Sequence, residues 1–524
     1  MTLLSEALEA EARGRVLESF ALCSQRVRES PADPDALTLM GRLCALGGDL
    51  CAAIGLQRHA LAIDPSHVRA AEDLTRSLAL RASPDEGEAL YAQAVGMRPD
   101  IDVHYLTPGA LDAFDGIDGL RALLERAVAA DPAHSRAHAA LANVLTRQND
   151  FAAALQSYQR ALLLDPANAA VQLATGDIEY DFGNEGNAQR HRANAFARQA
   201  LYLAAARSVP YARSVLVLAR PGPWAANVPL DFVVDHDRIA VHRLYLPVGK
   251  MAAVVGPLPP YDLIFNAVAY AEAATEAIAL AEQFIASQAK PAINLPQHLW
   301  KTARSSLPAA LRDVPACSVP EATRIAREIP AGVAFPLIAR PVDSHAGRGL
   351  ERVDDAGALD AYIARHPGDA GFDLAPFVDY RSADGYYRKY RVMFIGGVAF
   401  PYHLAISRQW IVHYNTSLMP DNAWMRAEEE AFLDAPQSVF ARWEDTTRGI
   451  AAAIGLDYFG VDCTVSPDGG MLVFEADAAM FVHAKDPPNL FPYKPQAVDR
   501  IRAALNALII TTDVTCADST PSNG

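Results

Sequence analysis

The sequence predicts a multidomain protein of class α plus α/β, which begins with an array of helical repeats and continues as sheet-containing domains. Two observations carry this prediction. Prolines recur in steps of 33 or 34 residues through the N-terminal part, at Pro31, Pro65, Pro99, Pro132 and Pro166. After residue 210 the helical pattern gives way to short β-rich runs that alternate with helices. A chain of 524 residues is long enough for several domains, each with its own core.

Charge, cysteines and hydropathy exclude several functions. The net charge of −16 argues against a nucleic-acid or anionic-membrane partner, because neutralising phosphates requires clustered Lys and Arg. Six cysteines without a CxxC pair are typical neither of a disulfide framework nor of a zinc ribbon. The N-terminal segment contains acidic residues, and no segment is apolar enough to span a membrane. We therefore expect a cytoplasmic protein.

The regular spacing of the prolines indicates which type of repeat is present. Five residues before each of the last four prolines lies an alanine, where the two helices of a pair cross closely: Ala60, Ala94, Ala127 and Ala161. This pattern resembles the tetratricopeptide repeat, although residues 104–116 depart from it. We expect residues 1–205 to form a solenoid whose concave surface binds a peptide or protein. The alternative is an unrelated helical bundle, for which a constant phase has no explanation.

An acidic hairpin near the C-terminus gives the clearest chemical signal. In GVDCTVSPDGGMLVFEAD (460–477), strand alternation places Val473, Glu475 and Asp477 on one face, and the turn SPDGG can bring Asp462 beside Glu475. Three carboxylates on one face make a poor core but suitable oxygen ligands for Mg²⁺. The sequence therefore predicts a metal site at Asp462, Glu475 and Asp477. The alternative is an exposed sheet face with solvated acids.

Basic residues upstream can supply the positive charge that a phosphate needs. Arg340 ends an apolar strand before a glycine-containing loop, whose backbone N–H groups can surround phosphate oxygens. Alternation places Lys389 and Arg391 on one face of a hairpin that turns at Gly396 and Gly397. The loop matches neither the P-loop pattern nor GxGxxG.

Taken in order, these parts resemble the ATP-grasp superfamily, and within it the RimK-like peptide or amino-acid ligases. The resemblance covers about residues 211–510 and includes the final G-x-D … F-E-x-D motif. It implies a pre-ATP-grasp α/β domain at 211–318 and an ATP-grasp domain at 319–512. The small lobe would span about 319–378 and the large lobe about 379–512. The small, polar tail at 513–524 is expected to be disordered.

The resemblance also implies residue roles and two ligands, ATP and Mg²⁺. Asp462, Glu475 and Asp477 match the metal-binding acids, and Arg391 matches the arginine that faces the γ-phosphate and the acyl-phosphate. The other nucleotide-binding matches are Arg304 and Arg340 (usually lysines), Lys389, the loop Ser344, His345, Ala346, Gly347, Arg348 and Gly349, and the hinge Phe377, Val378 and Asp379. Besides the two arginines, Asp477 departs from the usual Asn and Pro376 from the acid common in the hinge.

The implied activity is ATP- and Mg²⁺-dependent ligation of a carboxylate to an amine through an acyl-phosphate, on a peptide or protein substrate that the repeats recruit. His403 or His413 would deprotonate the amine, and Arg408 would bind a substrate carboxylate. The departures from the family pattern leave open a catalytically degenerate adaptor. A small-molecule kinase on the same fold is a third reading.

Overall fold

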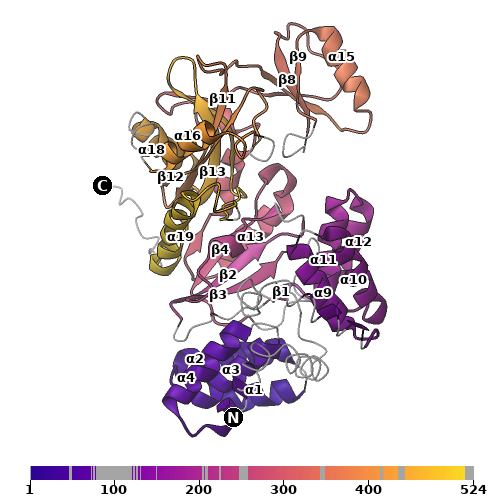
Figure 1. The fold of residues 1–524 in the computed structure, drawn as a ribbon, viewed down its shortest axis with the longest axis vertical. Helices are drawn as coiled ribbons and strands as arrows, with labels where there is room; N and C mark the ends of the chain where they lie inside the picture. The colour runs from indigo at the N-terminus through magenta and orange to yellow at the C-terminus, as the bar shows by residue number, and fades with distance from the viewer. Residues whose placement is uncertain are drawn as a thin grey trace, which may run out of the picture.

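In the computed structural model, the described part of the chain is a mixed α/β structure in which N-terminal helices precede three β-sheets (Figure 1). The structure describes residues 2–74, 121–202, 211–246, 258–342, 349–413, 417–434, 443–484 and 486–513, with short gaps in the first three ranges, together with Ser77 and Ala206. The repeat positions predicted at Ala94, Pro99 and Ala127 lie outside the described residues, as do loop residues 344–348 and the tail after 513. Within the described ranges, no helix has both the length and the apolarity needed to cross a membrane.

Paired helices form the N-terminal region in two described groups. The first group comprises α1 (Leu3–Ala12), α2 (Val16–Glu29), α3 (Pro34–Leu46) and α4 (Leu50–Ile63), and the second comprises α9 (Ser135–Arg147), α10 (Phe151–Leu164), α11 (Ala169–Asp181) and α12 (Glu185–Phe196). Small residues allow the helices of a pair to approach. A Cβ atom at Gly176 would lie 3.1 Å from the Ala188 carbonyl oxygen. Ala60 and Ala161, at the predicted crossing positions, are buried.

The first sheet is mostly parallel and has the strand order β1-β3-β2-β4-β5. Its strands are β1 (Leu201–Tyr202), β2 (Arg213–Ala219), β3 (Ile239–Tyr245), β4 (Leu263–Asn266) and β5 (Ala292–Ile293). β1 runs antiparallel to β3, so this sheet begins inside the range predicted for the repeats. After β4 the chain continues into the 3₁₀ helix η4 (Ala271–Ala273) and then α13 (Thr275–Ser287).

A small antiparallel sheet has its own core and lies within the range predicted for the small lobe, so we call this unit the small lobe. Its order is β7 (Thr323–Ile325), β10 (Phe372–Pro376), β8 (Leu337–Pro341) and β9 (Glu351–Val353). Helix α15 (Ala356–Arg365) contributes Leu359 and Tyr362 to this core. In Figure 1 this unit lies apart from the N-terminal helices, beyond the third sheet.

The third sheet has the order β12-β11-β13-β14-β6, and because most of it lies within the range predicted for the large lobe, we call this unit the large lobe. It consists of β11 (Tyr387–Ile395), β12 (Val398–Ser407), β13 (Tyr458–Val465), β14 (Met471–Asp477) and β6 (Cys317–Ser318), a strand from the range predicted for the preceding domain. Gly396 and Gly397 both have positive φ, as a two-residue hairpin turn requires. Helices α16 (Ala423–Asp434), α18 (Glu444–Ile454) and α19 (Lys494–Thr511) flank the sheet (Figure 1).

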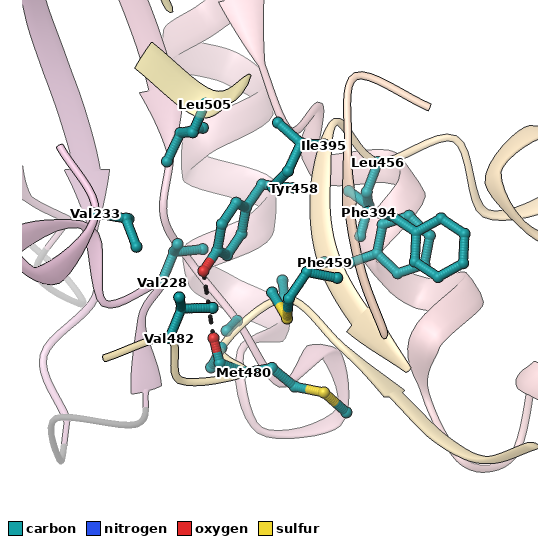
Figure 2. Close-up of a cluster of buried hydrophobic side chains, with 14 of the residues drawn as sticks. Val228, Val233, Phe394, Ile395, Leu456, Tyr458, Phe459, Met480, Val482 and Leu505 are labelled. Atoms are coloured by element: carbon teal, nitrogen blue, oxygen red, sulfur yellow. Dashed lines mark hydrogen bonds between the residues drawn. The ribbon is translucent and has the colours of Figure 1, made fainter. Parts of the chain in front are cut away.

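One continuous hydrophobic core joins the first sheet to the large lobe. Figure 2 shows Val228 and Val233, from the segment between β2 and β3, beside Tyr458 of β13 and Leu505 of α19. The Tyr458 hydroxyl is satisfied inside this core because it donates to the Met480 carbonyl oxygen at 3.3 Å. The two units are therefore packed as one body around the start of β13.

Asn294, directly after β5, connects the same two units through its side chain. Its Nδ2 donates to the Tyr458 carbonyl (2.9 Å), and its Oδ1 accepts from the Tyr458 N–H (2.7 Å), as a neighbouring strand would. Its own N–H donates to Asp457 Oδ2 at 2.8 Å. Asn294 has a φ of 57°, in the left-handed region that Asn tolerates better than most residues.

Two substitutions at Asn294 separate its hydrogen bonds from its backbone conformation. We expect Asn294→Ala to lower the free energy of unfolding by about 2–4 kcal/mol, because it removes two buried hydrogen bonds and places alanine at positive φ. Asn294→Gly removes the same hydrogen bonds, but glycine adopts positive φ without strain. Its loss in free energy of unfolding should therefore be smaller than that of Asn294→Ala by about 1 kcal/mol. Urea unfolding measures both values. A glycine variant as stable as wild type would show that the side-chain bonds contribute nothing.

Candidate active site

A row of four ionisable side chains crosses the large-lobe sheet at one level. His403 on β12 pairs with Arg391 on β11, Arg391 pairs with Asp462 on β13, and Asp462 pairs with Glu475 on β14. All four side chains line one cavity of about 830 Å³. The predicted proximity of Asp462 and Glu475 across their hairpin is therefore present in the structure.

Two β-bulges lie beside this row. On β12 the pairing shifts so that Tyr402 is an extra residue next to His403, and on β14 Phe474 is extra next to Glu475. Bulges re-aim side chains, and both extra residues line the cavity. Strict alternation placed Val473 on the face of Glu475, and this expectation is wrong. Val473 is fully buried in the core behind the sheet, while Leu472 and Phe474 face the cavity.

Asp462 lies at the centre of the row and is only 1% exposed. Arg391 binds both of its oxygens, with Nε 2.6 Å from Oδ1 and Nη2 2.9 Å from Oδ2, and Lys389 Nζ lies 2.9 Å from Oδ2. Burial alone would raise the pKa of Asp462, but the charges of Arg391 and Lys389 outweigh it and hold this pKa well below its usual range. Asp462 is therefore a permanent anion that fixes two cations on the cavity wall.

Asp477 lies at the end of β14, the strand that carries Glu475, and its environment contrasts with that of Asp462. It pairs with Gly460, where a Cβ atom would lie 2.5 Å from the Met480 sulfur, so only glycine fits opposite it. Its Oδ1 accepts the Ala479 N–H at 2.9 Å, and its carboxylate is also hydrogen-bonded to Tyr270. Burial, reinforced by the charge of Glu475, raises the pKa of Asp477 to about 7.

These acids do not form a three-residue metal site in this structure. Among the described residues, no three His, Cys, Asp or Glu side chains are placed to hold a metal ion. Asp462 directs its oxygens at Arg391 and Lys389, so its role as a metal ligand stays a prediction. Glu475 and Asp477 remain on the cavity wall, and this pair fits Mg²⁺, which proteins commonly hold by one or two carboxylates together with phosphate oxygens.

Cations from the small lobe and from the segment after η5 (Pro296–Thr302) form the opposite wall. Arg340 on β8 pairs with Asp373 on β10, and Arg304 Nη1 lies 4.0 Å from Asp373 Oδ2. Asp373 also accepts from Arg324 on β7, with Nε 2.8 Å from Oδ1. Burial and the charge of Arg304 lower the pKa of Arg340 to about 10, so it is still charged at neutral pH. Arg304 and Arg340 both line the cavity.

An apolar end of the cavity lies at the hinge between the lobes. Phe377 and Val378 line it together with Trp410, whose ring meets that of Phe377 edge to face at 5.6 Å. The Phe377 N–H is already used, because it donates to the Pro336 carbonyl oxygen at 3.1 Å. Flat aromatic walls of this kind suit a planar base.

Most of the predicted site residues converge on this cavity. Those that line it are Arg304, Arg340, Phe377, Val378, Lys389, Arg391, His403, His413, Asp462, Glu475 and Asp477. Three described residues do not line it. Asp379 pairs with Arg381 at 2.9 Å on the outside, Arg408 bonds the Tyr386 hydroxyl at 3.1 Å, and Gly349 packs against Pro341. Ser344, His345, Ala346, Gly347 and Arg348 lie outside the described residues.

Both candidate bases are histidines whose pKa lies below the ordinary value. His403 is 6% exposed, and burial together with the charge of Arg391 holds its pKa well below 6.5. His413 is half-buried, and burial and Lys389 lower its pKa in the same direction. Both are neutral at pH 7, which is the form that can accept a proton.

Several cavity residues were missed in the sequence. Tyr270 follows β4, Asp373 lies within β10, and Tyr402 occupies a bulge, while Asp486 and Lys494 form an ion pair at 3.4 Å. Of these residues, only Tyr270 could have been predicted from the sequence. It follows a strand of a parallel sheet, and residues in that position gather at the edge where ligands bind. The others reach the cavity through tertiary packing or an irregular strand.

The comparison with protein-family models agrees with the repeat part of the resemblance. The tetratricopeptide repeat family model matches residues 121–184. No curated protein matches the chain by sequence. Similar solved structures include the VanG D-Ala:D-Ser ligase from Enterococcus faecalis (12% identity, TM-score 0.38, covering 57% of this chain and 99% of that chain). Two others are a RimK domain ATP-grasp protein from Sphaerobacter thermophilus (15%, 0.33, 57% and 99%) and the D-alanine-D-alanine ligase from Coxiella burnetii (12%, 0.38, 57% and 95%). The chemistry of the site has to come from this chain's own residues.

The raised pKa of Asp477 predicts a pH-dependent effect of Asp477→Asn. The folded state keeps a proton that the unfolded state releases near 3.8, so wild type loses stability as the pH rises from about 4 to about 7. Asn stays neutral and can still accept from the Ala479 N–H. We therefore expect the variant to be more stable by about 1–3 kcal/mol at pH 7.5, with a smaller gain at pH 5.

Urea unfolding of both proteins from pH 5 to pH 8 in metal-free buffer measures this difference. The difference in free energy of unfolding between Asp477→Asn and wild type should increase up to about pH 7 and then stay constant. A difference that does not change with pH would show that Asp477 titrates normally in the folded protein.

Proposed function

We propose that this chain is an ATP- and Mg²⁺-dependent carboxylate–amine ligase. A single observation carries the proposal: one cavity has Arg304 and Arg340 on one wall and Arg391, Glu475 and Asp477 on the other. A metal-bound triphosphate needs cations for its oxygens and carboxylates for its metal, and both are present here. The apolar end at Phe377 and Trp410 provides a place for the base.

The residues have distinct roles in binding ATP. Arg304 and Arg340 would bind phosphate oxygens from the small-lobe side, since both are charged cavity residues. Glu475 and Asp477 would hold Mg²⁺. When bound, the metal would supply positive charge to the β- and γ-phosphates. Its arrival would also favour the ionised form of Asp477, whose pKa is otherwise raised by burial.

The proposed reaction has two steps. First, a carboxylate oxygen attacks the γ-phosphorus of ATP, giving an acyl-phosphate and ADP. The amine then attacks the acyl carbon, and inorganic phosphate leaves as the amide bond forms and the amine loses a proton. Arg391 would stabilise the negative charge on the transferring phosphoryl group, and its bidentate bond to Asp462 holds it in place for this role.

The proton released by the amine needs a base. His403 and His413 both line the cavity, and their lowered pKa values leave them neutral and able to accept it. His403 lies in the row beside Arg391, whereas His413 is the more exposed of the two. Both remain candidates for the general base.

The substrate is proposed to be a peptide or protein, because the tetratricopeptide match at 121–184 is typical of regions that bind other proteins. A second candidate function is an adaptor with a degenerate ligase domain. It is favoured by the ion pairs of Asp462 with Arg391 and Lys389, which occupy an acid expected to face the metal.

Isothermal titration with a non-hydrolysable ATP analogue tests the proposal. We expect wild type to bind the analogue in the presence of Mg²⁺ and at least about tenfold more weakly without it. Glu475→Gln should lose most of the Mg²⁺-dependent gain, because it removes a ligand charge and keeps the side-chain size. Glu276→Gln, on the exposed surface of α13, is the matched control and should behave as wild type.

Absence of nucleotide binding in wild type, with or without Mg²⁺, would rule out the ligase and favour the adaptor. If binding is found, product analysis distinguishes a ligase from a kinase, because only a ligase produces a new amide together with ADP.

A further inference from the structure

Arg220 lies at the point of the first sheet where α/β proteins commonly bind ligands. It follows β2, which has β3 on one side and β4 on the other, both parallel to it. The chain leaves β2 toward β3 and later returns to β4 on the opposite side. The carboxyl end of β2 is therefore a topological switch point, and ligands of open α/β sheets bind at such points.

The guanidinium of Arg220 makes no ion pair within the described part of the chain, and its buried Nε makes no hydrogen bond there. Arginine is rarely buried unless it is paired, since an uncompensated charge is costly to remove from water. The residue as a whole is half-buried, so the rest of the side chain is open to a ligand.

The backbone of Arg220 is fixed by Asn227. The Arg220 N–H donates to Asn227 Oδ1 at 2.8 Å, and Asn227 Nδ2 donates to the Arg220 carbonyl oxygen at 2.9 Å. Asn227 is itself bridged to Val268, just after β4. These bonds fix the backbone from which the Arg220 side chain extends, so the backbone loses no further entropy when an anion binds.

The surroundings of Arg220 connect the helical region to the cavity. Phe196 of α12 packs on Tyr245 of β3 with ring centroids 5.0 Å apart, which places the last helix pair against this sheet (Figure 1). Burial lowers the pKa of Arg220; Tyr270 opposes this shift, and Arg192 of α12 adds to it. Arg192 already binds Asp177 at 2.9 Å, whereas Arg220 has no ion pair among the residues that the structure describes. Tyr270 lines the cavity, and Arg220 does not.

We infer that Arg220 anchors a carboxylate side chain of an acidic peptide between the last helix pair and the cavity. The guanidinium fork binds a carboxylate bidentately. Helix α11 of the adjoining pair lies within residues 121–184, which match a tetratricopeptide repeat, a type of repeat that commonly presents a binding surface for other proteins. That the peptide is the substrate rests on the proposed function, whereas the anchoring site stands on Arg220 itself.

Binding of a blocked triglutamate peptide, followed by isothermal titration, tests this inference. Wild type should bind triglutamate and not blocked triglutamine. Arg220→Met should weaken triglutamate binding by about tenfold or more, and Arg220→Lys should retain part of it, because lysine keeps the charge without the fork. Arg312→Met, which removes an exposed guanidinium, is the matched control and should bind as wild type.

Equal binding of triglutamate by wild type and Arg220→Met, or no binding by either folded protein, would overturn the inference. Binding of inorganic phosphate at Arg220 in preference to triglutamate would also overturn it, because the ligand class would then be wrong. Thermal unfolding checks whether Arg220→Met is folded. We expect it to be, because the substitution removes a charge that has no ion pair among the described residues.

Titrating the same variants with the ATP analogue and Mg²⁺ separates this inference from the proposed function. Arg220 lies outside the cavity, so Arg220→Met should bind nucleotide as wild type does. Arg220-dependent peptide binding without any nucleotide binding would disprove the ligase and keep the anchor. Nucleotide binding without Arg220-dependent peptide binding would disprove the role of Arg220 and leave the proposed ligase function standing.

Discussion

The bidentate ion pair between Arg391 and Asp462 is the constraint on which the rest of the site depends. Asp462 is almost completely buried, and a buried carboxylate is tolerated only with close partners. Removing one partner of such a pair typically costs about 3–5 kcal/mol, so the two strands cannot slip relative to each other without a large penalty. Because β11 and β13 are fixed against each other at this level, His403 on β12 and Glu475 on β14 lie in the same row across the sheet. The two bulges place Tyr402 and Phe474 beside them.

The environment separates two carboxylates that are similar in sequence. Asp462 faces Arg391 and Lys389, and its pKa is depressed despite burial. Asp477 is half-buried beside Glu475, and its pKa is raised to about 7. Negative charge is therefore compensated in the middle of the sheet and uncompensated at the end of β14. A divalent cation at Glu475 and Asp477 would relieve that excess, which is the physical reason for proposing the metal at these two residues, whereas the role of Asp462 as a metal ligand stays a prediction.

The sequence predicted what depends on local spacing. The turn at Gly396 and Gly397, the shared face of Lys389 and Arg391, and the approach of Asp462 to Glu475 all follow from period-two alternation and a short turn. Prediction from the sequence failed where the position of a side chain depends on the order of strands in the sheet or on a β-bulge. The cationic partners of Asp462 come from a strand more than sixty residues away, and the bulge at Phe474 turned Val473 inward. Motif order selected Asp379, and a place in the sequence next to the basic hairpin selected Arg408. Both side chains make their contacts outside the cavity.

The most direct test of the central claim is a crystal structure of the protein with Mg²⁺ and a non-hydrolysable ATP analogue. We expect the metal on Glu475 and Asp477, the triphosphate between them and the Arg304–Arg340 wall, and the base near Phe377 and Trp410. Arg391 should remain on Asp462 while its guanidinium faces the γ-phosphate. A nucleotide bound elsewhere on the molecule, or within the cavity without metal on Glu475 or Asp477, would contradict it.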